Sequence, residues 1–120
     1  MMLRGVRGAI TVEENSEGAI LAATREVLTA LIEANGIEEH EVASVLFSST
    51  PDLGAAFPAR AARELGWRNV ALMCSQELAV QGGLQRCIRV LVHWNTARGP
   101  DEIRHCYLRA AVALRPDLTG

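Results

Sequence analysis

Short apolar runs, separated by polar turns, predict a series of β-strands along the chain. Four such runs can be identified: residues 4–12, 42–47, 70–74 and 87–94. In the first run, Gly5 and Gly8 allow another part of the backbone to approach closely. The last run has the clearest strand pattern, since it is apolar from Cys87 to Trp94 except for Arg89 and His93.

A long helix is predicted between the first two strands. Asn15 and Ser16 are both residue types that cap helix N-termini, and Asn35-Gly36 is a common helix stop. Between them the helix is expected to run to about residue 34. Its apolar residues fall on one face at helical spacing: Ile20, Leu21, Val27, Leu28, Leu31 and Ile32. That face is therefore expected to pack against the sheet.

Two further helices are predicted from proline and acidic residues. Pro58 suits the first position of a short helix that ends at Gly66. The Pro-Asp-Glu sequence at 100–102 predicts the first turn of a last helix, because acids are favourable at a helix N-terminus. This helix must stop before Pro116. The expected order is β-α-β-α-β-β-α, an α+β fold with helices over one sheet.

Size and charge exclude several classes of protein. The 120 residues are the length of one domain, which we expect to span 1–120, and 49% of them are hydrophobic. Domains this small are commonly helped by oligomerisation. The net charge of −2 gives no basic footprint for nucleic acid. No apolar run approaches the roughly 20 residues that a membrane span needs.

The cysteines and histidines indicate the compartment and bear on metal binding. Cys74, Cys87 and Cys106 are an odd number, with no CxxC motif and no secretory leader. This pattern predicts reduced thiols in a cytoplasmic protein. A zinc site with His93 and His105 has no recognised ligand spacing, so we expect no metal and no cofactor.

Two arginines lie inside apolar strands. Every one of the twelve cationic residues is arginine, and Arg7 and Arg89 each interrupt an apolar run. An unpaired buried charge costs several kcal/mol, so each needs an anionic partner. A shared anionic ligand explains both, since guanidinium binds carboxylates bidentately. For Arg89 the alternative is an internal ion pair with Glu77 or Asp52.

Other candidate residues have ordinary explanations beside functional ones. Glu77 follows a strand end, where an acid is most often solvated, and Cys74 alone is most often a small buried hydrophobe. Tyr107 falls within the predicted last helix, where its ring would pack in a core or interface. A Cys–His nucleophile pair is formally available, but nothing in the sequence places the two together. Three more arginines are expected to be exposed charges on a helix face or in the tail: Arg60, Arg63 and Arg115.

Five stretches, in order, resemble the monofunctional AroH-type chorismate mutases, a small trimeric class. They are RGVRGAITVEEN (4–15), SSTPDL (48–53), FPARAAREL (57–65), CSQELAVQGGLQRCIRVL (74–91) and RHCYLRAAVALRPDL (104–118). The resemblance implies a ferredoxin-like α+β subunit with a mixed β-sheet. Three subunits would assemble into a pseudo α/β-barrel, a homotrimer with active sites between neighbouring subunits. The implied reaction converts chorismate to prephenate, on the route to phenylalanine and tyrosine.

The resemblance also implies roles for individual residues. Arg7 and Tyr107 would bind the side-chain carboxylate of the substrate. Arg89 would reach that carboxylate and the ether oxygen, where negative charge develops as the bond breaks. Glu77 and the region of Cys74 would hold the ring hydroxyl. Further substrate contacts are implied for Met73, Phe57, Arg60, Arg63, Leu114 and Arg115.

Two other classes of protein stay open. One is a trimeric binding or regulatory module that has kept the anion site without catalysis, although Glu77 would then be superfluous. The other is a deaminase-like enzyme on a comparable trimeric fold. The stretches at 48–53 and 57–65 favour the mutases over this second class.

Overall fold

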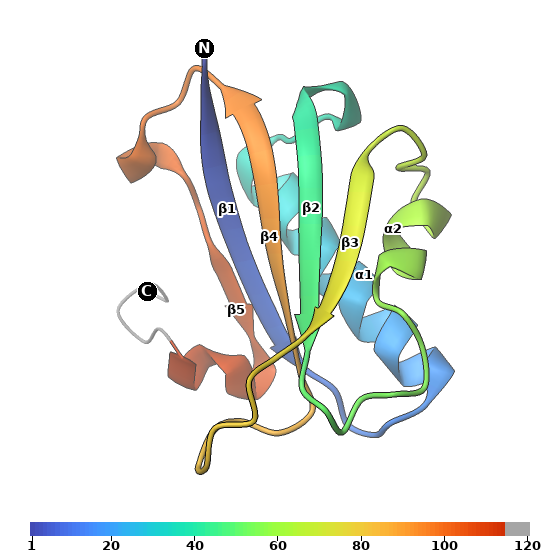
Figure 1. The fold of residues 1–120 in the computed structure, drawn as a ribbon. Coiled ribbons are helices and arrows are strands. Elements are labelled where there is room, and N and C mark those ends of the chain that lie inside the picture. Colours follow the sequence, from blue (N-terminus) through green and yellow to red (C-terminus); the bar gives the residue numbers. More distant parts are fainter. Residues whose placement is uncertain (115–120) are drawn as a thin grey trace.

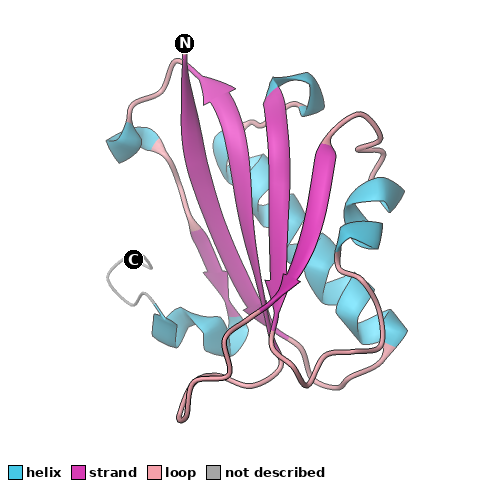
Figure 2. Cartoon of the chain, viewed as in Figure 1, coloured by secondary structure: helices cyan, strands magenta, loops and turns pink. Residues whose placement is uncertain are grey.

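The computed structural model describes residues 1–114 and shows a five-stranded mixed sheet with helices on one face (Figures 1 and 2). The main elements are β1 (Met2–Thr11), α1 (Glu17–Asn35), β2 (Val42–Ser49), α2 (Ala59–Glu64), β3 (Ala71–Gln76), β4 (Cys87–Thr96) and β5 (Cys106–Leu108). Three short 3-10 turns complete them: η1 (Glu39–Glu41), η2 (Pro100–Glu102) and η3 (Arg109–Leu114). No helix within residues 1–114 is long and apolar enough to cross a membrane.

The strand order across the sheet is β3-β2-β4-β1-β5. β4 is central and pairs antiparallel with β1 on one side and β2 on the other. The edge strands β3 and β5 pair in parallel with β2 and β1. The sheet is therefore mixed, and the α+β prediction is confirmed. All four predicted strands are present, each longer than predicted at one end or both.

The helical layer forms as the sequence predicts. The Ser16 side chain accepts a hydrogen bond from the Ala19 amide at 3.2 Å, so Ser16 is the N-cap of α1. At the other end Gly36 has φ 71°, the left-handed geometry that favours glycine at a helix end. The predicted apolar face of α1 packs on β1, β2 and β4 and forms the core with Phe47, Ile88 and Val92, among others.

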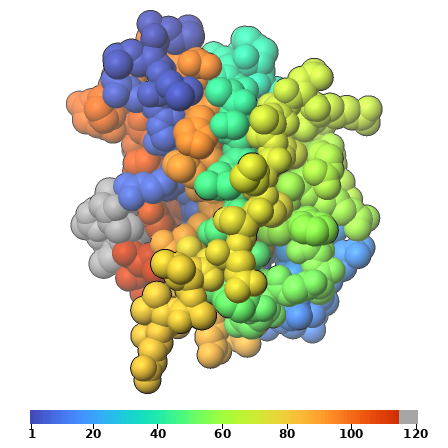
Figure 3. All heavy atoms as spheres, in the orientation of Figure 1, coloured from blue at the N-terminus to red at the C-terminus, as the bar shows by residue number. Residues whose placement is uncertain are grey.

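No helix within residues 1–114 covers the opposite face of the sheet. In Figure 3 the strands themselves form the surface, with side chains of β1, β4, β2 and β3 lying next to one another. Since side chains alternate along a strand, Arg7, Leu46, Ser48, Arg89 and Leu91 point to this open face while their neighbours face the core. Arg89 is 49% exposed, so its predicted burial is wrong.

The predicted α-helix from residue 100 is also wrong. After the single turn η2 the chain extends into β5, so Tyr107 lies in a strand and not within a helix. Buried Asn35 keeps this segment extended through its side chain. The side-chain Nδ2 donates to the Arg104 carbonyl (2.9 Å), and the side-chain Oδ1 accepts from the Arg104 amide (2.8 Å). These bonds and the pairing with β1 outweigh the local helix signal. The predicted stop before Pro116 lies outside the described residues.

Candidate active site on the open face

An open cavity of about 480 Å³ lies on the uncovered face, where β1, β4 and β5 run side by side. Arg7 from β1 and Arg89 from β4 both line it. Leu91 is opposite Arg7 and two residues from Arg89, so the two guanidinium groups come from diagonal positions on one face. Tyr107 from β5 and Leu114 from η3 complete the wall. The structure thus gathers four predicted site residues around one cavity.

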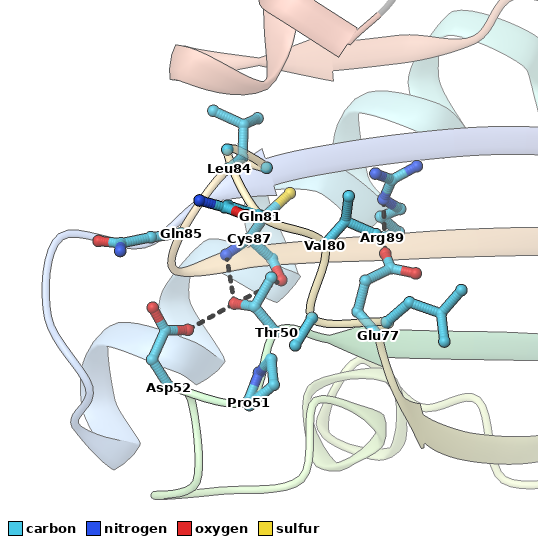
Figure 4. A pocket seen from close by; sticks show the side chains of 14 residues that line it. Thr50, Pro51, Asp52, Glu77, Val80, Gln81, Leu84, Gln85, Cys87 and Arg89 are labelled. Carbon is cyan, nitrogen blue, oxygen red and sulfur yellow. Dashed lines mark hydrogen bonds and ion pairs between the residues drawn. The ribbon is translucent and has the colours of Figure 1, made fainter.

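Arg89 also lines a second open cavity, of about 570 Å³, beside the loop of residues 77–86. Figure 4 shows Arg89 and Glu77 pointing toward each other across this space. The Arg89 Nε and the Glu77 Oε2 form an ion pair in which they lie 2.6 Å apart. Of the two ion-pair partners considered from the sequence, the structure therefore selects Glu77. Such a pair, half exposed to solvent, contributes about 1 kcal/mol or less to stability, so it is better understood as orienting two functional groups.

The sheet itself fixes the position of Glu77. Its amide donates to the Ser49 carbonyl at 2.9 Å, which continues the pairing of β3 with β2 by one residue. Ser48 Oγ then donates to Glu77 Oε2 at 3.2 Å. Glu77 is therefore a half-buried, hydrogen-bonded carboxylate and not a solvated loop acid.

The far end of the 77–86 loop is held by Asp52. Its carboxylate accepts hydrogen bonds from the Arg86 amide at 3.0 and 3.1 Å. It also accepts one from Thr50 Oγ1 (2.5 Å), and Thr50 Oγ1 in turn accepts from the Cys87 amide (3.0 Å) (Figure 4). Arg86 has φ 46°, a left-handed conformation that is unusual for a non-glycine residue. Asp52 was considered only as a partner for Arg89, and its actual role was missed.

A second group of predicted residues lies elsewhere. A cavity of about 520 Å³ beside α2 is lined by Phe57, Arg60, Arg63 and Cys74, among others. Phe57 is 73% exposed, and Met73, on the open face of β3, is 66% exposed. Arg60 pairs with Glu17 (3.0 Å) and Glu64 (3.3 Å), so both its ion pairs lie on the helical side.

The predicted site residues thus fall into two groups. The β1/β4/β5 group consists of Arg7, Glu77, Arg89, Tyr107 and Leu114, and the α2/β3 group consists of Phe57, Arg60, Arg63, Met73 and Cys74. Within residues 1–114 the first group lines the two cavities that share Arg89, and the second group, apart from Met73, lines the cavity beside α2. Arg115, the remaining predicted residue, lies outside the described residues.

The thiols of Cys87 and Cys106 are in buried surroundings, and the imidazoles of His93 and His105 take part in hydrogen bonds of the sheet. Burial raises the pKa of the Cys87 thiol, with the charge of Arg89 acting in the opposite direction. Burial likewise raises the pKa of Cys106. The Nδ1 atom of His93 lies 2.9 Å from Ser44 Oγ, and that of His105 accepts from the Arg7 amide at 2.9 Å. Nucleophilic catalysis needs an activated thiolate, which the environments of Cys87 and Cys106 disfavour.

The arrangement suits binding of a small anion that also carries a hydroxyl group. Two guanidinium groups and a tyrosine surround one cavity, and a carboxylate acceptor stands beside one of the arginines. Guanidinium groups form bidentate bonds with carboxylates, and the carboxylate accepts from a hydroxyl. Fold and site together define an α+β protein with an anion-binding cavity on an open sheet.

Comparison with known proteins narrows this class to one family. Residues 3–118 match the family model described as chorismate mutase type I. The chain is 55% identical to the chorismate mutase AroH of Thermus thermophilus, over 98% of this chain and 97% of that protein. It is 50% identical to the AroH of Bacillus subtilis (strain 168), over 99% and 94%. A solved chorismate mutase from Clostridium thermocellum superposes with a TM-score of 0.90 at 45% identity, covering 92% of this chain and 98% of that one.

The chain belongs to the type I chorismate mutase family. The family that the five sequence stretches predicted is therefore confirmed, and with it the assignment as an enzyme of the isomerase class.

Proposed function

We propose that this chain rearranges chorismate to prephenate in the biosynthesis of phenylalanine and tyrosine. The observation that carries the proposal is the placement of Arg7, Arg89 and Tyr107 around one cavity, with Glu77 bonded to Arg89. Near-full-length similarity to two AroH proteins supports it. Each subunit is one domain spanning residues 1–120, and the reaction needs no metal or cofactor. We place it in the cytoplasm, where its free thiols stay reduced.

The reaction is an intramolecular [3,3] shift without a nucleophile or net proton transfer. The protein must hold the dianion in a compact chair-like conformer and stabilise the charge that separates as the ether bond breaks. Arg7 and Tyr107 bind the side-chain carboxylate. Arg89 binds it too and stabilises negative charge on the ether oxygen, using its Nη groups because Glu77 occupies Nε. Glu77 accepts a hydrogen bond from the ring hydroxyl, on the half of the substrate that becomes positive.

The magnitudes are consistent with this division of roles. An acceleration of 10⁶-fold requires about 8 kcal/mol of transition-state stabilisation. A preorganised donor aimed at developing charge contributes roughly 3–4 kcal/mol. Restricting the substrate to its reactive conformer contributes the rest, because the enzyme holds the reacting atoms in near-attack geometry.

We further propose that the active form is a homotrimer, a pseudo α/β-barrel with sheets inside and helices outside. In it the α2/β3 group of one subunit would complete the β1/β4/β5 group of its neighbour. Two observations support this: the groups line separate cavities within a chain, and large apolar residues are exposed near both. They include Leu3, Phe57, Met73, Leu78 and Val80. Exposed apolar surface of this kind marks interfaces.

The reaction is tested by following the ultraviolet absorbance of chorismate with purified protein and no added cofactor. Wild-type protein should convert chorismate, with prephenate as the sole product. The Arg89→Ala variant should lose several orders of magnitude in kcat while keeping its fold and oligomeric state. Tight prephenate binding without any turnover by folded wild-type protein would refute catalysis and favour a metabolite-binding module. Near-normal activity of Arg89→Ala would refute the role given to Arg89.

A further inference from the structure

Within residues 1–114, Ser48 provides the one hydroxyl that bonds to the Glu77 carboxylate of the Arg89–Glu77 pair. It lies near the end of β2 on the open face. Its register partner in β4 is Arg89, and its partner in β3 is Ser75, two residues before Glu77. The sheet pairing therefore sets Ser48 between the strand that carries Arg89 and the strand that leads to Glu77.

Both partners of the Glu77 carboxylate lie at the same oxygen. Oε2 accepts a hydrogen bond from the Ser48 hydroxyl at 3.2 Å and lies 2.6 Å from the Arg89 Nε in the ion pair. A hydroxyl and a guanidinium therefore hold Oε2 together. Within residues 1–114, every hydrogen bond and ion pair of the Glu77 side chain goes to Oε2. Oε1 keeps its full acceptor capacity.

The Ser48 bond opposes a competing arrangement of the pair. Arginine and carboxylate commonly form two parallel bonds, with both oxygens taken by one guanidinium. In that arrangement Oε1 would bond to an Nη group of Arg89, and both groups would be withdrawn from a ligand. The Ser48 hydroxyl, which comes from a different strand, holds Oε2 and so keeps the carboxylate in the orientation in which only Oε2 contacts the guanidinium.

We propose that Ser48 is a positioning residue that holds Oε2 of Glu77, so that Oε1 is the oxygen that accepts the substrate hydroxyl. The inference rests on the proposed role of Glu77. Ser48 lines the same cavity as Arg7 and Arg89, and the role assigned to it acts through Glu77 and not on a reacting atom. Its effect is to keep Oε1 and the Arg89 Nη groups available at the same time.

The test uses a matched pair of β-branched variants. Ser48→Thr keeps the hydroxyl, whereas Ser48→Val replaces it with a methyl group of similar size. A lost hydrogen bond to a charged group corresponds to roughly a ten- to hundredfold change. We expect Ser48→Val to lower kcat by about that factor with a smaller change in KM. Ser48→Thr should stay near wild-type values. Ser48→Ala provides the same loss without added volume, should Ser48→Val fail to fold.

A double-mutant cycle separates positioning from general structural effects. If Ser48 acts through the Glu77 carboxylate, Ser48→Ala should cost almost nothing in a Glu77→Ala background. Equal kcat for Ser48→Thr and Ser48→Val, or purely additive effects in the cycle, would overturn the inference.

Calorimetric measurement of prephenate binding tests the role of Ser48 independently of whether the protein turns over chorismate. Absence of turnover in the wild-type protein would count against the reaction. Weaker prephenate binding by Ser48→Val than by Ser48→Thr would still support the positioning of Oε1, and equal binding in that case would count against it.

Discussion

The main-chain amide of Arg7 donates a hydrogen bond of 2.9 Å to Nδ1 of His105. β5 pairs with β1 only from Gly8 to Ile10, so Arg7 lies just before this ladder begins. The imidazole there takes the place of a main-chain acceptor. Because Nδ1 accepts, it carries no proton, and the ring proton of the neutral imidazole is on Nε2. His105 thereby ties the strand bearing Arg7 to the strand bearing Tyr107.

Replacing His105 by asparagine or by glutamine should distinguish the roles of the two ring nitrogens. The asparagine oxygen can occupy the place of Nδ1, whereas the glutamine oxygen lies nearer that of Nε2. We expect His105→Asn to keep KM for chorismate near the wild-type value. His105→Gln should raise KM about tenfold, since an unsatisfied amide costs roughly 1–3 kcal/mol. Steady-state kinetics would decide, and identical KM values for the two variants would contradict the role of Nδ1.

Mixing two impaired variants should restore activity if sites are shared between subunits. Arg89→Ala alters the β1/β4/β5 group and Arg63→Ala the α2/β3 group. In mixed trimers with head-to-tail interfaces, about a quarter of the sites would combine an intact group from each variant. Activity after joint refolding should rise accordingly. Arg89→Ala mixed with Arg7→Ala is the control, since both changes fall in one group and no recovery is expected. Absence of recovery in the first mixture would place each site within a single subunit.

Gly8 should tolerate no side chain. A Cβ there would lie 2.9 Å from Leu31 Cδ1 and 3.0 Å from side-chain atoms of Val27 and Val90. Overpacking of this kind costs about 1–3 kcal/mol, so Gly8→Ala should lower the free energy of unfolding by that amount. Gly18→Ala is the control: nothing lies within 4 Å of its Cβ, and alanine in α1 should stabilise by about 0.5–1 kcal/mol. Urea unfolding of both variants measures the difference, and a neutral Gly8→Ala would contradict the packing.

Glu41 should make stability depend on pH at the acid end. The hydrogen bond from the Trp94 indole (2.9 Å), aided by one from the Glu38 backbone, lowers the pKa of Glu41 from its ordinary value of 4.5. The folded state thus favours the carboxylate. The resulting stabilisation is present above pH 4.5 and is lost as pH falls through the lowered folded-state pKa.

Glu41→Gln isolates this effect, because its amide oxygen can still accept from Trp94 while carrying no charge. The wild-type protein should be more stable than the variant near neutral pH, and the difference should vanish in acid. Urea unfolding across this range, followed by circular dichroism, tests it. A difference that does not change with pH would mean that the charge of Glu41 has no part in it.

Much of the fold could be predicted because its signals are local. The cap at Ser16, the stop at Gly36 and the apolar face between them define α1 within the sequence itself. The prediction of a last helix was wrong because the structure of its segment depends on distant contacts and not on local signals. Its segment is held extended by Asn35 and by pairing with β1, contacts between residues distant along the chain. The Pro-Asp-Glu sequence at 100–102 produced one turn, η2, and no more.

The site was predictable to the extent that charge stood out against an apolar background. Arg7 and Arg89 were identified in this way, whereas Glu77 and Tyr107 depended on the family resemblance. Ser48 and Asp52 were not recognised as site-supporting residues. Nothing in their local sequence distinguishes a serine or aspartate that orients another side chain from one that faces water. Their partners, Glu77 and Arg86, lie about thirty residues further along the chain.

The ion pair between Glu77 and Arg89 also bears on selectivity among anions. The charge of Arg89 is balanced by an internal carboxylate. A ligand therefore meets a compensated cation, and it binds the Nη groups of Arg89 while the ion pair with Glu77 stays in place. Sulfate offers negative charge but no hydroxyl for Glu77. It is consequently expected to be a weak competitor at this site, even though arginines surround it.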